Sequence, residues 1–270
     1  FGSNFDSSVS LNDYETPYLE SGEGGIGLGA TYKLGSSRLL VGMTNPINQG
    51  NDNTIGLRKS LVASLEYGNA DDAAITLMTG VTQDKDSLLD STGNDAYSLS
   101  GSKSNTTFAA FKAQTQLSGG LSLTGIATLA NTNMTKPDNS LVNSASNVKS
   151  SSVSLIANKR NLFGDDSMSF FVIQPNRVSD GSMSIRLSNL ADSDGNLTYR
   201  NKDINLEPTE RQVDYGLSYR KDFDKDISFS IKHMMTDNLN HKQDTQTTSS
   251  SFIGAKYKDL KVGLTTSSDE

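Results

Sequence analysis

The sequence predicts an all-β protein, specifically an antiparallel up-and-down β-barrel of about 12 to 14 strands. Three observations lead to this prediction. Short segments alternate apolar and polar residues, which is the pattern of a strand with one apolar and one polar face. Short turns alternate with longer polar loops, as they do on the two rims of a membrane barrel. No segment shows a helical period over more than about two turns.

The clearest strand lies at residues 211–221, where Val213, Tyr215, Leu217 and Tyr219 fall on one face and polar residues fall on the other. Residues 227–235 repeat this pattern after a short Asp-rich connection, so the two segments predict a hairpin. Upstream, residues 167–173 and 182–187 predict a similar pair of strands around the polar stretch 174–181.

The rest of the chain continues the same rhythm. Residues 1–23 contain Pro17 and have no sustained period, so we expect a leader or linker before a single barrel domain at residues 24–270. Long polar loops are expected at residues 84–104 and 132–149. The further predicted strands lie at residues 25–34, 38–43, 60–68, 73–81, 107–116, 121–131, 150–159, 198–205, 251–258 and 260–264.

The length of the clearest strand fits a membrane barrel. Ten steps from Arg211 to Lys221, at about 3.3 Å each and tilted near 45°, project to roughly 23 Å. The apolar band of an outer-membrane barrel is about 25 Å tall. However, aromatic residues make up only 7% of the chain and tryptophan is absent, which is unusual for the aromatic girdles of such barrels. A soluble β-sandwich, or a sheet-rich subunit that assembles through strand edges, is therefore the alternative.

Composition excludes several classes of protein. The net charge is −7 with both signs interspersed, whereas a nucleic-acid-binding protein carries a basic stripe. Cysteine is absent, so the chain has neither disulfides nor a thiolate metal site. Because no apolar run approaches the roughly 18 residues of a transmembrane helix, we expect any insertion to use a closed barrel.

Few residues are candidates for chemistry. The only histidines, His233 and His241, lie outside any catalytic motif; we expect the first on a strand face and the second in a solvated loop. Asp192, Asp194 and Asn196 are weak calcium candidates, because the glutamate that completes a calcium loop is missing and an Asp-Gly turn is a simpler explanation. We expect no catalytic residue and no cofactor.

Two segments carry a family resemblance. Residues 161–181 contain a Gly-Asp pair at Gly164 and Asp165 and then a Gln-Pro-x-Arg-Val run, and residues 204–214 contain a Leu-x-Pro-x-x-Arg element. This combination resembles the C-terminal β-domain of bacterial subtilisin-like serine peptidase autotransporters. The resemblance covers roughly the last 110 residues. The later matching positions are Gln174, Pro175, Arg177, Val178, Leu206, Pro208 and Arg211.

The resemblance implies a non-catalytic translocator or anchor barrel at the bacterial outer membrane or cell surface. Its partners would be outer-membrane lipid, facing Val213, Tyr215, Leu217 and Tyr219, and a passenger protease domain. Barrels of this family end in an aromatic residue, whereas this sequence ends in Ser-Ser-Asp-Glu, so we expect either a lost terminus or a different mode of insertion. The alternative is a secreted or cell-surface structural β-protein whose partners are other copies of itself.

Overall fold

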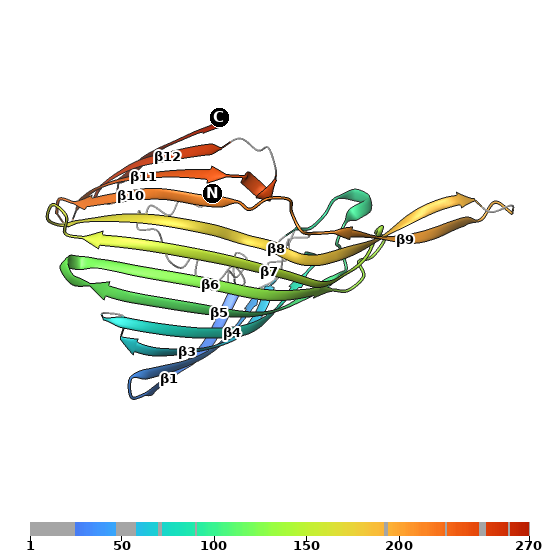
Figure 1. Cartoon of the computed structure of the whole chain (residues 1–270), viewed down its shortest axis with the longest axis horizontal. Helices are drawn as coiled ribbons and strands as arrows, with labels where there is room; N and C mark the ends of the chain where they lie inside the picture. Colours follow the sequence, from blue (N-terminus) through green and yellow to red (C-terminus); the bar gives the residue numbers. More distant parts are fainter. Residues whose placement is uncertain are drawn as a thin grey trace.

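The computed structural model describes residues 25–46, 58–69, 72–89, 91–191, 194–224, 226–242, 247–258 and 260–269. These residues form one antiparallel sheet of 13 strands (Figure 1). Among them, consecutive strands pair along the chain, except that β9 pairs only with β8 and β10 also pairs with β8 rather than with β9. The prediction of an all-β, up-and-down architecture with about 12 to 14 strands is confirmed. The strands are β1 (Gly25–Leu34), β2 (Ser37–Pro46), β3 (Arg58–Asn69), β4 (Ala73–Lys85), β5 (Lys103–Leu117), β6 (Leu121–Met134), β7 (Val142–Arg160), β8 (Asp166–Ala191), β9 (Leu197–Asn205), β10 (Val213–Asp222), β11 (Ile227–Asp237), β12 (Thr248–Tyr257) and β13 (Leu260–Asp269).

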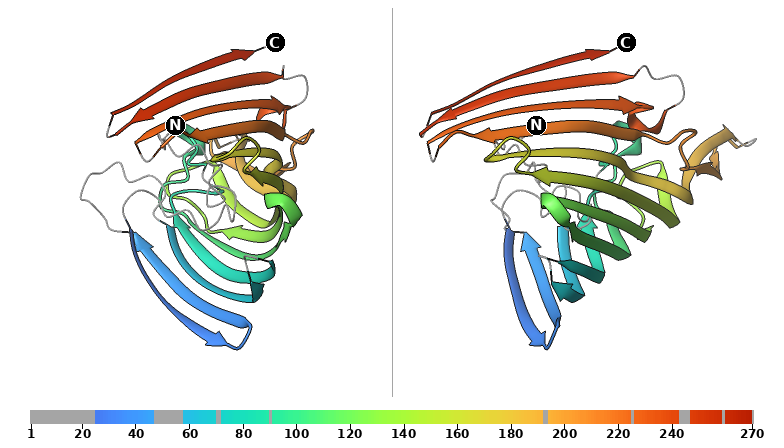
Figure 2. Two further views of the ribbon diagram at one scale, coloured as in Figure 1. Left: turned by 90° about the vertical axis from the view of Figure 1, so that its left-hand side faces the viewer. Right: turned by 60° about the vertical axis from the view of Figure 1, so that its left-hand side comes forward.

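The sheet is curved but open. Figure 2 shows it as a trough, with β1 and β13 along its two separate edges. Among the described residues, β1 pairs only with β2 and β13 only with β12, so the closure expected of a barrel is not reached. Along the free side of both edge strands, the backbone N–H and C=O groups therefore lack a sheet partner within this part of the chain, whereas a closed barrel pairs them. The predicted leader at residues 1–23 lies outside the described residues.

β8 is longer than the sequence predicts. It is one strand of 26 residues, where two strands separated by the stretch 174–181 were expected. Ser151 of β7 is opposite Arg177, while Val153 is opposite Gln174, so β8 carries the one extra residue of a bulge at this point. Pro175 lies within this bulge, where no ladder hydrogen bond from its nitrogen is needed. The second half of β8 pairs with β9 in an arm that projects beyond the sheet (Figure 1).

The loop predicted at residues 132–149 is too long. In the structure β6 continues to Met134 and β7 begins at Val142. Met134, Val142 and Val148 are buried in a cluster with Leu88 and Leu99 from the connection between β4 and β5. The many serines of this stretch conceal its strand pattern, whereas burial of its few apolar residues fixes the strand in place.

Alternate connections lie at the same rim, because consecutive strands of a meander run in opposite directions. At one rim the connections have two to five residues, and we call it the short-turn rim. The opposite rim carries the longer connections, and we call it the long-loop rim. This is the predicted asymmetry of a barrel. The short connections are residues 35–36, 70–72, 118–120, 161–165, 223–226 and 258–259, and 118–120 form the 3-10 turn η2 (Ser118–Gly120).

Two aromatic residues fill the centre of the sheet on one face. Phe108 is almost fully buried and lies opposite Gly80, where an added Cβ would come within 2.7 Å of its ring. Phe171 is fully buried beside Gly216, where a Cβ would come equally close to its ring, at 2.7 Å. Glycine at these two positions therefore makes space for the ring on the neighbouring strand.

Candidate functional site

The two faces of the sheet have an inverted distribution of polarity. In β4, Ile75, Leu77 and Val81 are exposed, whereas Thr82 and Asp84 on the opposite face are buried. β5 and β6 show the same pattern, with exposed Phe111 and Leu129 and buried threonines. We call the face with the buried residues the inner face and the other the outer face. A sheet that shows its large apolar residues to the surroundings and hides its hydroxyl groups suits a barrel in lipid.

The outer face carries a continuous apolar belt. Its exposed members come from the first strand to the last and far exceed the scattered apolar residues normal on a surface. The belt includes Leu28, Tyr32, Val41, Met43, Leu61, Leu65, Tyr67, Ile75, Leu77, Val81, Phe111, Leu123, Leu129, Val153, Leu155, Phe170, Leu217, Ile231, Ile253, Tyr257, Leu260, Val262 and Leu264.

The four residues predicted to face lipid lie on this outer face. Leu217 is 40% exposed and stands between Phe170 of β8 and His233 of β11. Tyr219 stands between Met168 and Ile231 in the next row, while Val213, Tyr215 and Tyr219 are half-buried by their neighbours. His233 lies on the same face as Ile231, as predicted, and its Nδ1 is 2.9 Å from Ser251 Oγ at the margin of the belt.

The belt crosses the strands at an angle. A row of paired residues runs from Tyr67 in β3, through β4 to β8 and β10 to β11, to Ser249 in β12. In β3 the belt residues, 61–67, extend from this row toward the N-terminal end of the strand. In β12 the belt residues, 253–257, lie on the C-terminal side of the row. Its centre therefore shifts by roughly nine residues over eight strand-to-strand steps. At about 3.3 Å per residue and 4.8 Å per strand this is a slant of roughly 35–40°, close to the strand tilt of closed barrels.

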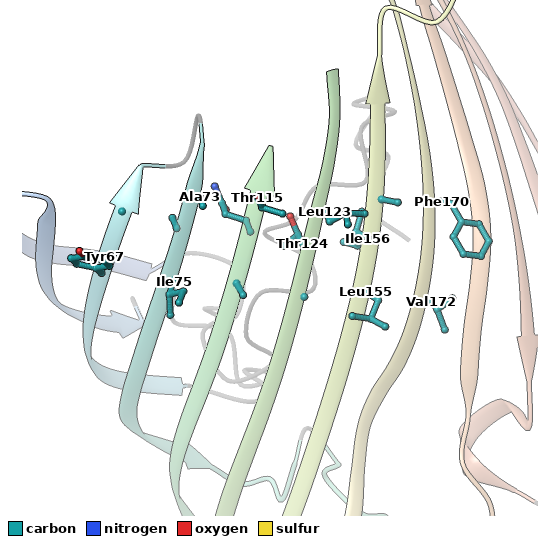
Figure 3. Close-up of a pocket in the computed structure, with 16 residues that line it drawn as sticks. Tyr67, Ala73, Ile75, Thr115, Leu123, Thr124, Leu155, Ile156, Phe170 and Val172 are labelled. Atoms are coloured by element: carbon teal, nitrogen blue, oxygen red, sulfur yellow. The ribbon is translucent and has the colours of Figure 1, made fainter. Parts of the chain in front are cut away.

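A shallow groove of about 610 Å³ lies within the belt, across β3 to β8 (Figure 3). Small residues form its floor, since Ala113 lies opposite Gly125. Tyr67 of β3 and Phe170 of β8 stand at its two sides, and Leu155 of β7 lies between them, opposite Gly125 (Figure 3). None of the described residues that line it is charged. The groove is therefore part of the apolar surface and offers no group for acid-base chemistry.

Four residues of the family resemblance, Gln174, Arg177, Pro208 and Arg211, meet at one place on the long-loop rim. Arg177 is buried and its guanidinium donates to the carbonyl oxygens of Pro208 (3.0 Å) and Glu210 (3.2 Å) and to Glu207 Oε1 (3.2 Å). Arg211 Nη1 donates to Gln174 Oε1 at 3.4 Å. The side chains thus hold the connection between β9 and β10 against the bulge of β8, and we name this cluster the rim junction.

The Gly-Asp pair lies at the opposite rim, in the turn before β8. Gly164 has a positive φ of 103°, and the carbonyl of Asp165 accepts the backbone N–H of Asp222. Next to the pair, the carboxylate of Asp166 accepts the backbone N–H groups of Leu162 and Phe163 and the hydroxyl of Tyr219. The pair and its neighbour therefore fix a tight turn between β7 and β8.

His241 belongs to the rim junction, so the prediction of a solvated loop residue is wrong. It ends the 3-10 turn η3 (Leu239–His241) and is half-buried. Its Nδ1 accepts the backbone N–H of Gln212 at 2.9 Å, and Nε2 therefore carries the proton and donates to the carbonyl of Asn176 at 3.2 Å. Burial and the nearby Arg177 charge lower the pKa of His241, and they outweigh Asn176 and Asp214, which raise it. A neutral imidazole thus links η3 to β8.

Acidification should weaken the rim junction. Because the folded-state pKa of His241 is below its ordinary value of 6.5, the unfolded chain takes up the proton first as pH falls, and stability present above pH 6.5 is lost. We expect the urea midpoint of the native chain to fall between pH 7.5 and pH 5 by more than that of His241→Gln. His233→Gln is the matched control and should retain the native pH dependence; equal pH dependence in all three chains would contradict the assignment.

Two of the three calcium candidates lie in the turn between β8 and β9. Asp192 lies outside the described residues, and Asp194 and Asn196 are exposed in the turn between β8 and β9. Within the described part of the chain, no group of three His, Cys, Asp or Glu side chains could hold a metal ion. No helix among the same residues is long and apolar enough to cross a membrane.

Comparison with known proteins gives little beyond the fold. Neither a protein-family model nor a curated protein matches the sequence. Among solved structures, the siderophore receptor PiuA from Acinetobacter baumannii is similar with a TM-score of 0.46 and 10% identity. The match covers 91% of this chain and 44% of the receptor, so the chain spans less than half of that protein's length. The class that the chain's own structure defines is an all-β protein with a single antiparallel up-and-down sheet.

Proposed function

We propose that the chain is a β-barrel of an outer membrane. The observation that carries this proposal is the apolar belt, which runs across the whole outer face at the slant of a tilted barrel wall. A soluble protein would place these side chains inside and the buried hydroxyl groups outside. The location we propose is therefore the bacterial outer membrane, with its lipid in contact with Leu217 and the other belt residues.

Two features of the topology support the proposal. The path of neighbouring strands contains β1 to β8 and β10 to β13, which is an even number, twelve. β1 and β13 therefore run antiparallel and can pair directly, as closure of a bacterial barrel requires. Apart from the five-residue turn 192–196 between β8 and β9 at the tip of the arm, the short connections lie on one rim, which is the arrangement of periplasmic turns in these barrels.

The more specific role we propose is that of a translocator or anchor for a passenger domain, as in the subtilisin-like autotransporters. Its support is that the residues of the resemblance, Gln174, Arg177, Pro208 and Arg211, form one hydrogen-bonded junction although they are distant in sequence. In this proposal the chain itself is non-catalytic and binds no cofactor, and any peptidase activity belongs to the passenger.

A second candidate is a secreted or cell-surface structural protein that assembles through strand edges. The open edges of β1 and β13 favour it, because unpaired backbone groups of one copy can pair with those of another. The two candidates make opposite predictions about which chain the edge strands pair with.

Cysteine cross-linking separates the candidates, because the sequence contains no native cysteine. Alignment of the belt places Ala30 of β1 near Val262 of β13, so a cysteine at each, scanned by one residue for register, should form a disulfide within a monomer. Ala255→Cys with Val262→Cys, which are paired residues, is the positive control. Disulfides found only between chains would reject the closed barrel and favour the assembly.

A further inference from the structure

The groove on the outer face extends to the short-turn rim (Figure 3). Gly68 and Ala73, which line it, are on either side of the connection 70–72 at that rim. Its floor is open because Ala113 and Gly125 are paired there and neither has a long side chain. The space of about 610 Å³ is within the roughly 300 to 1,000 Å³ of pockets that hold small molecules.

A lysine stands at the rim end of the groove. Ala157 of β7 lines the groove between Leu123 of β6 and Phe170 of β8, which are paired with it on either side. Lys159 is the next outer-face residue of β7 toward the rim, about 7 Å further along the strand. Its side chain is half-buried, and its Nζ donates to the carbonyl oxygen of Gly119. Among the described residues, the partner of this ammonium is therefore a carbonyl and not a carboxylate.

The acid that follows on the same face does not take up this charge. Asp166, at the start of β8, accepts two backbone N–H groups of the preceding turn and the hydroxyl of Tyr219. Lys221 of β10 lies directly opposite Asp166 on the outer face. Lys159 therefore offers a positive charge where the apolar groove ends.

We propose that the groove holds one acyl chain of an anionic phospholipid, with the phosphate of the lipid beside Lys159. None of the described side chains that line the groove is charged, so the groove suits a hydrocarbon chain. Basic residues at the edge of a surface in a membrane attract anionic head groups. Because only surrounding lipid supplies such a ligand, the inference rests on the proposed membrane barrel. It deepens that proposal by assigning one selective lipid position to the belt.

Quenching of a single tryptophan by brominated lipid tests this site, because the sequence contains no native tryptophan. Phe170→Trp places the reporter at the groove, and Ile253→Trp places it in the belt on β12, outside the groove. In phosphatidylcholine vesicles with increasing fractions of brominated phosphatidylglycerol, the quenching curve gives the affinity for phosphatidylglycerol relative to phosphatidylcholine. We expect a preference of about fivefold at Phe170→Trp, the effect of roughly one lysine, and no preference at Ile253→Trp.

Two further changes assign the preference to the charge and to the groove. Lys159→Gln should remove it, whereas Lys159→Arg should retain it. Ala113→Leu fills the floor of the groove without a change of charge and should also reduce it. An unchanged preference in Ala113→Leu would mean that charge alone acts, and it would overturn the groove as the site. If Phe170→Trp did not insert, Leu123→Trp, on the other side of Ala157, gives the same comparison.

The failure of the site and the failure of the barrel give different results. Equal relative affinities at Phe170→Trp and Ile253→Trp would overturn the inference and leave the barrel proposal intact. Quenching at Ile253→Trp alone would show a groove covered by protein, such as a second copy of the chain, and would also overturn it. Absence of quenching at both positions would reject the membrane barrel and the lipid site together.

Discussion

Asp84→Ala should lower the free energy of unfolding by about 3 to 5 kcal/mol, because it breaks a buried ion pair from one side. Asp84 is 2% exposed and Arg58 is 5% exposed, and the carboxylate accepts from Arg58 Nε at 2.6 Å and Nη2 at 3.2 Å. The substitution leaves the guanidinium on the inner face without that carboxylate. Urea unfolding of the chain in detergent micelles or vesicles gives the change in free energy.

The exposed pair Lys149–Asp180 is the matched control. Its two side chains are 58% and 62% exposed at a separation of 2.8 Å, so Asp180→Ala should cost less than about 1 kcal/mol. Replacing both buried partners, as Arg58→Met with Asp84→Leu, should restore most of the stability lost by Asp84→Ala. If Asp84→Ala cost no more than Asp180→Ala, the buried pair would have no role in holding β3 to β4.

Leu217→Arg should destabilise the chain in lipid vesicles by about 2 to 4 kcal/mol, because it places a charge on the lipid-facing side of a barrel wall. Leu217 lies near the middle of the belt segment of β10, between Phe170 and His233. In a water-soluble protein the same change at a 40% exposed side chain would be nearly neutral, within about 0.5 kcal/mol. The size of the loss of stability therefore distinguishes an outer face in lipid from an outer face in water.

The control for this substitution is Asn131→Arg, which is exposed on the outer face of β6 but outside the belt. A charge near the membrane interface costs only about 0 to 1 kcal/mol. Equal costs for Leu217→Arg and Asn131→Arg in vesicles would contradict the position of the belt, even if both variants were folded.

The sequence predicts the strands well where apolar residues alternate strictly. The segment around Leu217 and the hairpin from β10 to β11 lie where the period-two pattern places them. Prediction was wrong where serines and a proline replace that pattern, as in β7 and at Pro175 of β8, because pairing with a long neighbour decides the conformation there.

The candidate site was only partly predictable. Alternation shows which residues share a face of a strand. The pattern is the same whether the apolar face packs in a dry core or faces lipid. The burial of Thr82 and Asp84 and the exposure of Leu77 could therefore be seen only in the structure. The rim junction was marked by Arg177 and Pro208, whereas His241 carried no signal, because its partners Gln212 and Asn176 bind it through backbone groups.

Lipid contact of the outer face is the central claim, and nitroxide labels at two adjacent residues of β10 test it most directly. Leu217 is on the outer face and Ser218, on the inner face, is 3% exposed. In vesicles, a label at position 217 should be relaxed strongly by oxygen, which partitions into lipid, and weakly by a water-soluble nickel complex, with a lower oxygen effect at position 218. Stronger relaxation of the label at 217 by the nickel complex than by oxygen would show an outer face in water and contradict the membrane barrel.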